Sequence, residues 1–413
     1  MTLPLVIPQE PVVLRDISAN RTPSPLTLSF VEERGDIADE WRALERELGG
    51  SSLACSWTWT ATWLDHFGDL IPHRFVVARS GGIPRGICLL AQGVEQKEGP
   101  FQVRTLHLGT AGEPQRDSVC VEYNDLLVAP QFRNEFVRKL LEQVAQDPRW
   151  DRFNLDGMTA DAAQPFLSAQ PAFRARETPS WYFDLNQARE NGKGVLGTLS
   201  YKVRKKLRHD LRAWGELTVE WAETSTQAES IFADLVRLHQ ERWTAEGKPG
   251  SFASQRFSDF HRDLIERLFP CGQAILFRVR QGAQVVGCLY AFVEGNRLLA
   301  YQSGRCAENS HLSPGAITNY LFIEEAFRRG FGAFDFLGGD SRHKRDLSTH
   351  CNQIVWSAWR RPRLKLLIVE GLKSVRRTLF RDPRRSKTGQ PPLAPDTAQV
   401  NEAPPIPARR ASE

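Results

Sequence analysis

The chain has 413 residues, a length typical of two or three domains, and its composition (41% hydrophobic, 25% charged) is that of an ordinary globular protein. Its 54 Lys and Arg against 49 Asp and Glu give a net charge of +5. Eleven Lys and Arg and two acids fall between Arg360 and Lys387, a local charge of 11 − 2 = +9, so the remainder carries 5 − 9 = −4. This distribution excludes a uniformly basic nucleic-acid-binding protein.

Cysteine usage and hydropathy point to a reducing compartment. The seven cysteines are scattered singly and form no Cys-x-x-Cys pair, which excludes a disulfide framework and spaced zinc ligands. No run approaches the roughly 18 apolar residues of a transmembrane helix. Glu10 and Asp16 lie where a secretory signal would have its apolar core. We therefore expect a cytoplasmic protein without a metal.

The two ends of the chain differ from its body. Residues 1–25 and 382–413 are rich in Pro, Ala, Ser and Thr and lack apolar periodicity, so we predict disordered tails.

An internal repeat organises the body. RFVVARSGGIPRGICLLAQG (residues 74–93) and AILFRVRQGAQVVGCLYAFVEG (274–295) each place two β-rich runs around a Gly-containing turn, which predicts a hairpin. Arg79 matches Arg280 and Gly86 matches Gly287 at the same offset. The repeat therefore predicts two similar α/β halves, unless two unrelated strand–helix–strand units merely look alike.

Each hairpin is followed by a helix that opens at proline and by a buried strand. In the first copy these are Pro130 and FNLDG (153–157); in the second they are Pro314, after a capping Ser313, and FDFLG (334–338). The segment between the copies predicts helices at 200–214, 226–246 and 257–268.

Five motifs of the second half resemble one family. They are RLHQERW (237–243), SFASQRFSDFH (251–261), YQSG (301–304), SPG (313–315) and FDFLGGDSRHK (334–344), and LSYKVRKKLRHDLRAWGEL (199–217) precedes them. They resemble the acetyltransferase domain of CelD-type cellulose-biosynthesis proteins, a GNAT group similar in turn to the Fem-type peptidyltransferases, which are tandem GNAT folds. The chain departs from the GNAT phosphate loop, since AENSHLSPGA offers only Gly315, and it has His343-Lys344 where the group often has Tyr-Lys.

The resemblance implies an α/β (α+β) fold of two GNAT-like halves in tandem, with mixed sheets flanked by helices. Residues 26–185 would form a degenerate half, in which Asn154 matches Asp335, that supports the fold or lines an acceptor groove. Residues 186–350 would form the acetyltransferase half, and residues 351–381 a closing strand and a basic amphipathic helix.

The same motifs suggest where a donor would bind. A helix N-terminus concentrates free N–H groups and can receive a phosphate. We expect the pyrophosphate of acetyl-CoA or another acyl-CoA at Ser313, Gly315 and Ala316; an ordinary capped helix is the alternative.

Two residues are candidates for catalysis. His239 lies beside an apolar helix face and has a side-chain pKa suited to a general base, although such a residue is more often a hydrogen-bonded core histidine. Asp335 lies inside a strand, where a carboxylate must find a partner. It could orient a catalytic group or accept a proton, or it could form a structural salt bridge.

Seven further residues are candidates for substrate binding. Arg204 belongs to a basic helix that could hold an anionic acceptor, and Tyr301 and Gln302 end the strand that lines the thioester cleft in the GNAT plan. The full set is Arg204, Arg242, Trp243, Tyr301, Gln302, Asp340 and Lys344.

Three functions remain open. The first is an acyl-CoA-dependent N- or O-acyltransferase, with acetyl as the first choice, that acts by direct attack on the thioester and takes a sugar or a polysaccharide or cell-envelope precursor as acceptor. The second is a Fem-like peptidyltransferase that uses aminoacyl-tRNA, the one reading that needs a nucleic acid. The third is a non-catalytic accessory protein of exopolysaccharide assembly that contacts a synthase. Residues 363–381 could dock on the body or rest on the inner face of a membrane.

Overall fold

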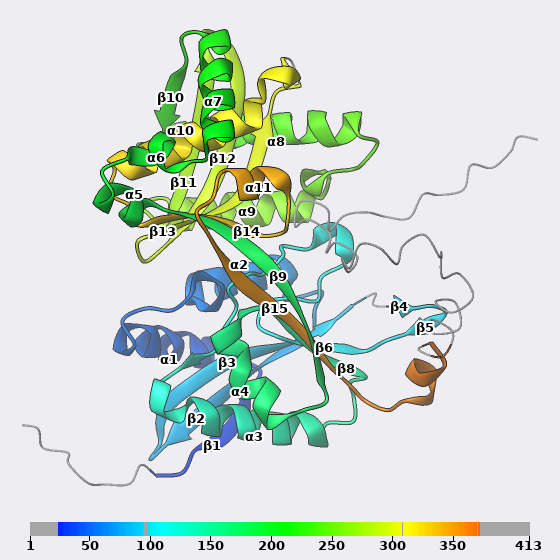
Figure 1. Cartoon of the computed structure of the whole chain (residues 1–413). Coiled ribbons are helices and arrows are strands. Elements are labelled where there is room, and N and C mark those ends of the chain that lie inside the picture. Colours follow the sequence, from blue (N-terminus) through cyan, green and yellow to red (C-terminus); the bar gives the residue numbers. More distant parts are fainter. Residues whose placement is uncertain (1–23, 95–96, 308, 370, 372–413) are drawn as a thin grey trace, which may run out of the picture.

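The computed structural model describes residues 24–94, 97–307, 309–369 and 371 (Figure 1). The tails predicted to be disordered lie outside the described residues except for residues 24 and 25, and so does the predicted basic helix beyond residue 371. Within the described part, no helix is long and apolar enough to cross a membrane.

The chain folds into two halves with the same order of elements. The first half contains β1 (Thr27–Val31), α1 (Arg34–Glu47), α2 (Trp57–Phe67), β2 (His73–Ser80), β3 (Ile83–Gly93), β6 (Thr105–Leu108), α3 (Arg133–Gln146), β8 (Arg152–Thr159), α4 (Ala160–Ala169) and β9 (Phe173–Asp184). The second half contains β10 (Thr218–Trp221), α8 (Ser225–Ala245), α9 (Gln255–Leu268), β11 (Ala274–Gln281), β12 (Gln284–Glu294), β13 (Arg297–Arg305), α10 (Pro314–Arg328), β14 (Ala333–Gly338), α11 (Arg342–Asp346) and β15 (His350–Arg360). Helices α5 (Leu185–Glu190), α6 (Gly194–Thr198) and α7 (Tyr201–Trp214) connect the halves, and β4 (Lys97–Glu98), β5 (Phe101–Gln102) and β7 (Leu127–Val128) are short.

The strands of the two halves also pair alike. In each half four strands are antiparallel neighbours, in the order β1-β2-β3-β6 in the first half and β10-β11-β12-β13 in the second. The strand after the crossover helix then pairs in parallel with the last of the four (β8 with β6, β14 with β13). The two predicted hairpins are confirmed, and each has its register shift at the matched arginine, between Ala78 and Arg79 and between Val279 and Arg280. The predicted tandem α/β fold is therefore confirmed.

The halves share one continuous sheet of 13 strands. Strand β9 of the first half pairs with β14, and β15 lies between β8 and β9. The two long ribbons run diagonally from the upper to the lower part of the molecule (Figure 1). Each half thus has a strand of the other half in its part of the sheet, and these pairings fix the position of the two halves relative to each other.

Two matched glycines explain how closely each crossover helix packs on its hairpin. A Cβ at Gly86 would lie 2.7 Å from Cδ1 of Phe136 on α3. A Cβ at Gly287 would fall on the Thr318 hydroxyl of α10 and 3.1 Å from the Gly304 carbonyl oxygen. Only glycine lets the helix lie at this distance from the sheet.

We predict that Gly86→Ala and Gly287→Ala each lower the free energy of unfolding by about 1–3 kcal/mol, because the added methyl group overpacks a filled contact. Denaturant unfolding monitored by circular dichroism measures the effect. Gly35→Ala in α1 is the control, since a Cβ there meets nothing within 4 Å. Equal stability of the three variants would contradict the packing argument.

Candidate active site

Strands β13 and β14 diverge in the middle of the second half. They pair only where Arg297–Leu299 faces Ala333–Asp335, and they separate beyond these residues. Two neighbouring cavities lie at this divergence. One, here called the helix cavity, has a volume of about 690 Å³ and lies between α7 and the start of α10. The other, the inter-half cavity, has a volume of about 160 Å³ and is lined by both halves. Arg242, Ser303, Asn319 and His343 line both, so the cavities adjoin.

The helix cavity is positively charged. Its lining cations are Lys202, Lys206, Arg242, Arg305 and Arg342. Three of them pair with Asp210, Glu246 and Asp346, at 2.7, 3.1 and 3.4 Å respectively. Five cations against three carboxylates leave an excess of 5 − 3 = +2. Burial lowers the pKa of Arg305, which marks a cation partly removed from water.

The N-terminus of α10 opens into the helix cavity through Ser313, Gly315 and Ala316, the three residues predicted to hold a donor. The prediction that Ser313 caps the helix is wrong. Ser313 has a left-handed backbone (φ 51°) and its side chain makes no capping hydrogen bond. The first turn is held instead by Asn319, whose side-chain amide donates to the Gly315 carbonyl at 2.7 Å. The first amides of a helix lack intrahelical acceptors and can face an anion.

The first half contributes Ser118, Cys120 and Glu122 to the inter-half cavity. The Glu122 carboxylate accepts a hydrogen bond at 2.8 Å from the backbone N–H of Gly338 through Oε2. Its other oxygen, Oε1, is buried and has no hydrogen-bond partner. Burial raises the pKa of Glu122 to about 7, although Lys344 and the Gly338 N–H act to lower it. This carboxyl group can therefore take up and release a proton near neutral pH.

Lys344, Tyr301 and Gln302, predicted to bind substrate, also line the inter-half cavity. The Lys344 ammonium donates to the carbonyl of Gly338 at 2.6 Å. The Tyr301 hydroxyl donates to the Val119 carbonyl, so it fixes the first-half segment that carries Glu122. Arg242 lines both cavities and stacks 5.0 Å over the Trp243 ring.

Asp335, predicted to be catalytic, lies outside both cavities and is fully buried. Its carboxylate accepts hydrogen bonds from Tyr123 (2.6 Å), Ser180 (2.9 Å) and the Leu337 N–H (2.6 Å), and it forms an ion pair with Arg297. This arrangement matches the structural alternative, a salt bridge that joins several segments of the chain.

His239, the other predicted catalytic residue, also lines neither cavity. Its Nε2 accepts from Trp243 at 2.9 Å and its Nδ1 lies 3.1 Å from the Gln240 side-chain oxygen. Burial lowers the pKa of His239 to about 4, so the ring is neutral at physiological pH. Both ring nitrogens thus have hydrogen-bond partners on the same helix, as in the core-histidine alternative. Trp243, predicted to bind substrate, is one of these partners.

Two further predicted substrate-binding residues are likewise placed outside the cavities. Arg204 donates to the carbonyls of Gly197 and Leu199, both at 2.8 Å, and so holds the end of α6. Asp340 accepts from Trp181 at 3.2 Å and pairs with Arg345 at 2.6 Å. Among the residues that the structure describes, no three His, Cys, Asp or Glu side chains form a group that could hold a metal ion.

Sequence reasoning missed Glu122 and the lysines that face the helix cavity. Lys202 and Lys206 were visible as part of the basic helix, and helical spacing places them on one side, one turn apart. Glu122 carries no such signal. It lies between Cys120 (φ 43°) and Tyr123 (φ 57°), whose left-handed backbones are not readable from residue type.

Residues 199–345 match the family described as an acetyltransferase (GNAT) domain. The match runs from the start of α7 into α11 and so spans the helix cavity. FemX is similar in fold, with a TM-score of 0.52 and 12% identity over 84% of this chain and 99% of that one.

Two other solved structures are similar. The C-terminal domain of an Agrobacterium fabrum protein named after lysylphosphatidylglycerol synthetases has a TM-score of 0.50 and 10% identity, over 84% of this chain and 97% of that one. A tandem GNAT protein from the clavulanic acid pathway has a TM-score of 0.42 and 13% identity, over 80% and 98%. No curated protein sequence matches the chain. Residues 199–345 are thus similar to a GNAT acetyltransferase domain, and the fold of the chain is similar to that of FemX.

Proposed function

We propose that the chain is an acyl-CoA-dependent acyltransferase whose active site is formed by both halves. The observation that carries the proposal is the junction of two cavities at the divergence of β13 and β14, one cationic and the other holding Glu122. The matching GNAT domain supports acyl transfer as the reaction class.

The helix cavity fits a polyphosphate donor. Its excess of two positive charges lies beside the N-terminus of α10, whose dipole also favours an anion. A Cβ at Gly315 would lie 3.1 Å from Cδ of Arg305, so a side chain at this position would fill the space in front of the helix. Lys202, Lys206 and Arg305 would hold the phosphates of acyl-CoA. When bound, the donor supplies a thioester carbonyl for direct attack.

Glu122 is proposed as the general base. Its buried Oε1 would accept the proton that an acceptor nitrogen or hydroxyl loses when it attacks the thioester. The Gly338 N–H would continue to donate a hydrogen bond to Oε2. Lys344 stays on the Gly338 carbonyl and balances the carboxylate charge. His239 and Asp335 act as structural residues in this account, because their hydrogen-bonding atoms are already used.

The acceptor we propose is a saccharide, as part of a polysaccharide or cell-envelope precursor. The inter-half cavity offers polar groups suited to hydroxyls, among them Ser118, Gln302 and Ser303. The resemblance of the second-half motifs to CelD-type proteins supports the same class and suggests a polysaccharide synthase as a partner, with acetyl as the transferred group.

We predict that acetyl-CoA binds saturably and that Gly315→Trp weakens binding at least about tenfold, because the indole occupies the phosphate site. Isothermal titration calorimetry measures both. Gln131→Trp is the matched control, since Gln131 is exposed and follows Pro130 in the first half as Gly315 follows Pro314.

Failure of the wild-type chain to bind acetyl-CoA or longer acyl-CoAs would contradict the proposal. Aminoacyl-tRNA binding in a parallel titration would then favour the Fem-like peptidyltransferase. Binding of neither ligand would favour the accessory protein.

We also predict that the rate of CoA release with a hydroxyl acceptor such as cellobiose falls as the pH drops below about 7. Glu122 has a raised pKa of about 7, so its basic form is present above that value and is lost below it. Glu122→Gln should lower the rate on the order of 10²–10⁴-fold and remove this pH dependence.

Glu113→Gln is the matched control for that measurement. Glu113 is another buried carboxyl of the first half, with a pKa raised to about 7 by burial, but it accepts from Trp63 and lines neither cavity. A pH profile unchanged in Glu122→Gln, or lost equally in Glu113→Gln, would rule out Glu122 as the base.

A further inference from the structure

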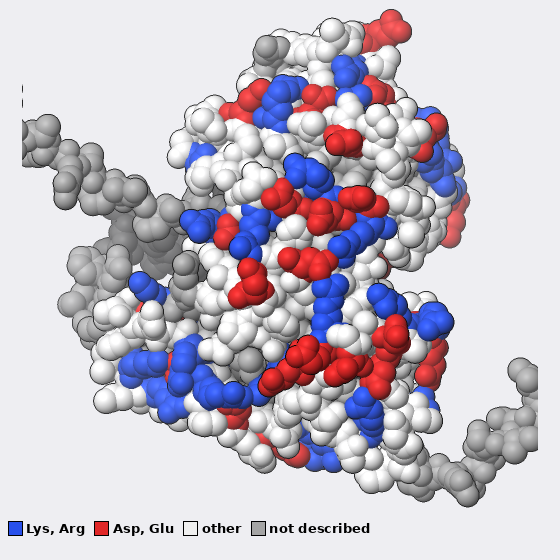
Figure 2. Space-filling view, turned by 180° about the vertical axis from the view of Figure 1, so that it is seen from behind, with Lys and Arg blue, Asp and Glu red and all other residues white. Residues whose placement is uncertain are grey.

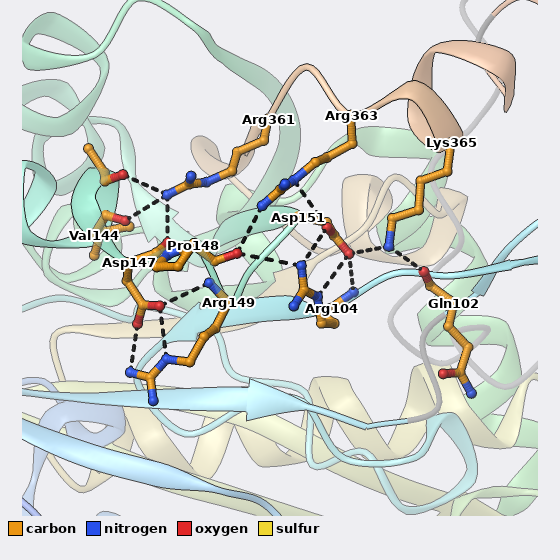
Figure 3. A network of polar contacts seen from close by, with 11 residues as sticks. Gln102, Arg104, Val144, Asp147, Pro148, Arg149, Asp151, Arg361, Arg363 and Lys365 are labelled. Carbon is orange, nitrogen blue, oxygen red and sulfur yellow. Dashed lines mark hydrogen bonds and ion pairs between the residues drawn. The ribbon is translucent and has the colours of Figure 1, made fainter.

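The described end of the chain returns to the first half after β15. Arg361 donates to the carbonyls of Ala145 and Asp147, both at 2.6 Å (Figure 3). Its guanidinium also lies 4.2 Å over the Trp150 ring. Residues 364–369 are helical, and Lys365 donates to the Gln102 carbonyl at 2.8 Å. Leu366 and Val369 are buried. One face of this helical segment is therefore docked on the first half.

Where the helical segment docks, several Lys and Arg side chains lie close together. Asp151 is fully buried and contacts Arg104, Arg363 and Lys365, at 3.2, 3.7 and 2.5 Å (Figure 3). Burial works to raise the pKa of Asp151, but hydrogen bonds from Arg104 and Lys365 outweigh it and lower the pKa to about 2. A single carboxylate thus holds three cations.

Neighbouring pairs extend the same pattern. Asp147 pairs with Arg74 and Arg149, and Glu98 pairs with Arg152 and Arg360. We call the whole set the C-terminal cationic cluster: Arg74, Arg104, Arg149, Arg152, Arg360, Arg361, Arg363 and Lys365 with Glu98, Asp147 and Asp151. Eight cations against three carboxylates give 8 − 3 = +5. Seen from behind, Lys and Arg gather over the first half on the side that carries residues 361–369 (Figure 2).

The outer face of the same helical segment is apolar. Leu364, Leu367 and Ile368 are 74%, 53% and 43% exposed, and their spacing of three and four residues places them on one face. Three large aliphatic side chains exposed together are unusual on a soluble surface and mark an interaction site. In the sequence, residues 372–387 add seven Lys and Arg and one Asp, or 7 − 1 = +6.

We infer that this surface binds an anionic lipid bilayer. The exposed Leu364, Leu367 and Ile368 would enter the boundary between headgroups and acyl chains, and the C-terminal cationic cluster would face the negative headgroups. The docked face, held by Arg361 and Lys365, fixes the orientation of the apolar residues toward the bilayer.

A bilayer fits the positive charge and the exposed aliphatic side chains better than a nucleic acid, the other large anionic partner, does. Nucleic acids attract cations through their phosphates, but they offer no environment in which exposed Leu and Ile side chains are buried. A bilayer satisfies the charge and the aliphatic face at once. The inference does not depend on the acyltransferase proposal, because it concerns a surface formed by the first half and the chain end.

Sedimentation of the full chain with vesicles tests the inference. We expect binding to phosphatidylcholine vesicles that contain phosphatidylglycerol, weak or no binding to pure phosphatidylcholine, and weakening as salt is raised. Leu364→Gln/Leu367→Gln/Ile368→Gln should reduce binding on the order of tenfold or more, because three apolar insertions are lost. Glutamine keeps a good helix propensity, so the docked segment is retained.

The matched control is Leu70→Gln/Ile83→Gln/Val219→Gln, which removes three exposed aliphatic side chains from scattered positions and should bind as the wild type does. Thermal melting should be similar for both triple variants. The inference fails if the wild-type chain ignores anionic vesicles, or if the two triple variants bind equally. It also fails if tRNA displaces the chain from vesicles and binds it more tightly than they do.

Discussion

The buried carboxylate of Asp335 is the contact on which the arrangement of the two halves depends. It meets Tyr123 from the first half, Ser180 from β9 and Arg297 from β13, and no water reaches it. A buried charge is tolerated only when it is paired and hydrogen-bonded, so these four segments must stay together. Since Tyr123 adjoins Glu122, the same contact holds the first-half segment against the inter-half cavity.

The exchanged strands make this arrangement rigid. Because β9 pairs with β14 and β15 with β8, neither half can move without breaking the central pairings of the sheet. Cys120 and Leu337, which line the inter-half cavity, have left-handed backbones, and so does Tyr123 beside Glu122. Such conformations cost energy and persist only where the surroundings enforce them, and at Tyr123 and Leu337 the hydrogen bonds to Asp335 do so. The two halves of the duplicated fold thus meet at one cavity that both of them line.

Local patterns were sufficient to predict much of this fold. The hairpins, the crossover helices and the offset between Gly86 and Gly287 follow from alternation and turn residues close together in the chain. The Pro-opened helix also placed Ser313, Gly315 and Ala316 together at a helix start, and these residues line the helix cavity, while donor binding there stays a prediction. Lys344, expected in a loop at a strand end, lines the inter-half cavity.

What the sequence could not reveal depends on distant pairs. Strand alternation placed Asp335 on one face, but its partner Tyr123 lies 212 residues away, so the sequence alone could not separate a structural role of this carboxylate from a catalytic one. His239 was similarly ambiguous until Trp243 was seen to donate to its ring. Glu122 follows no periodic pattern and is defined only by the second half that packs over it. The strand exchange is hidden for the same reason, since β9 and β15 pair across the halves.

The central claim is that one active site is built from both halves, with the donor at α10 and Glu122 opposite it. A crystal structure of the chain with acetyl-CoA tests it most directly. The account predicts electron density for the pyrophosphate at the first-turn amides of α10 and for the acetyl group between Ser303 and Leu337, facing Glu122. Density that places the acetyl group away from the inter-half cavity, or in the first half alone, would contradict it.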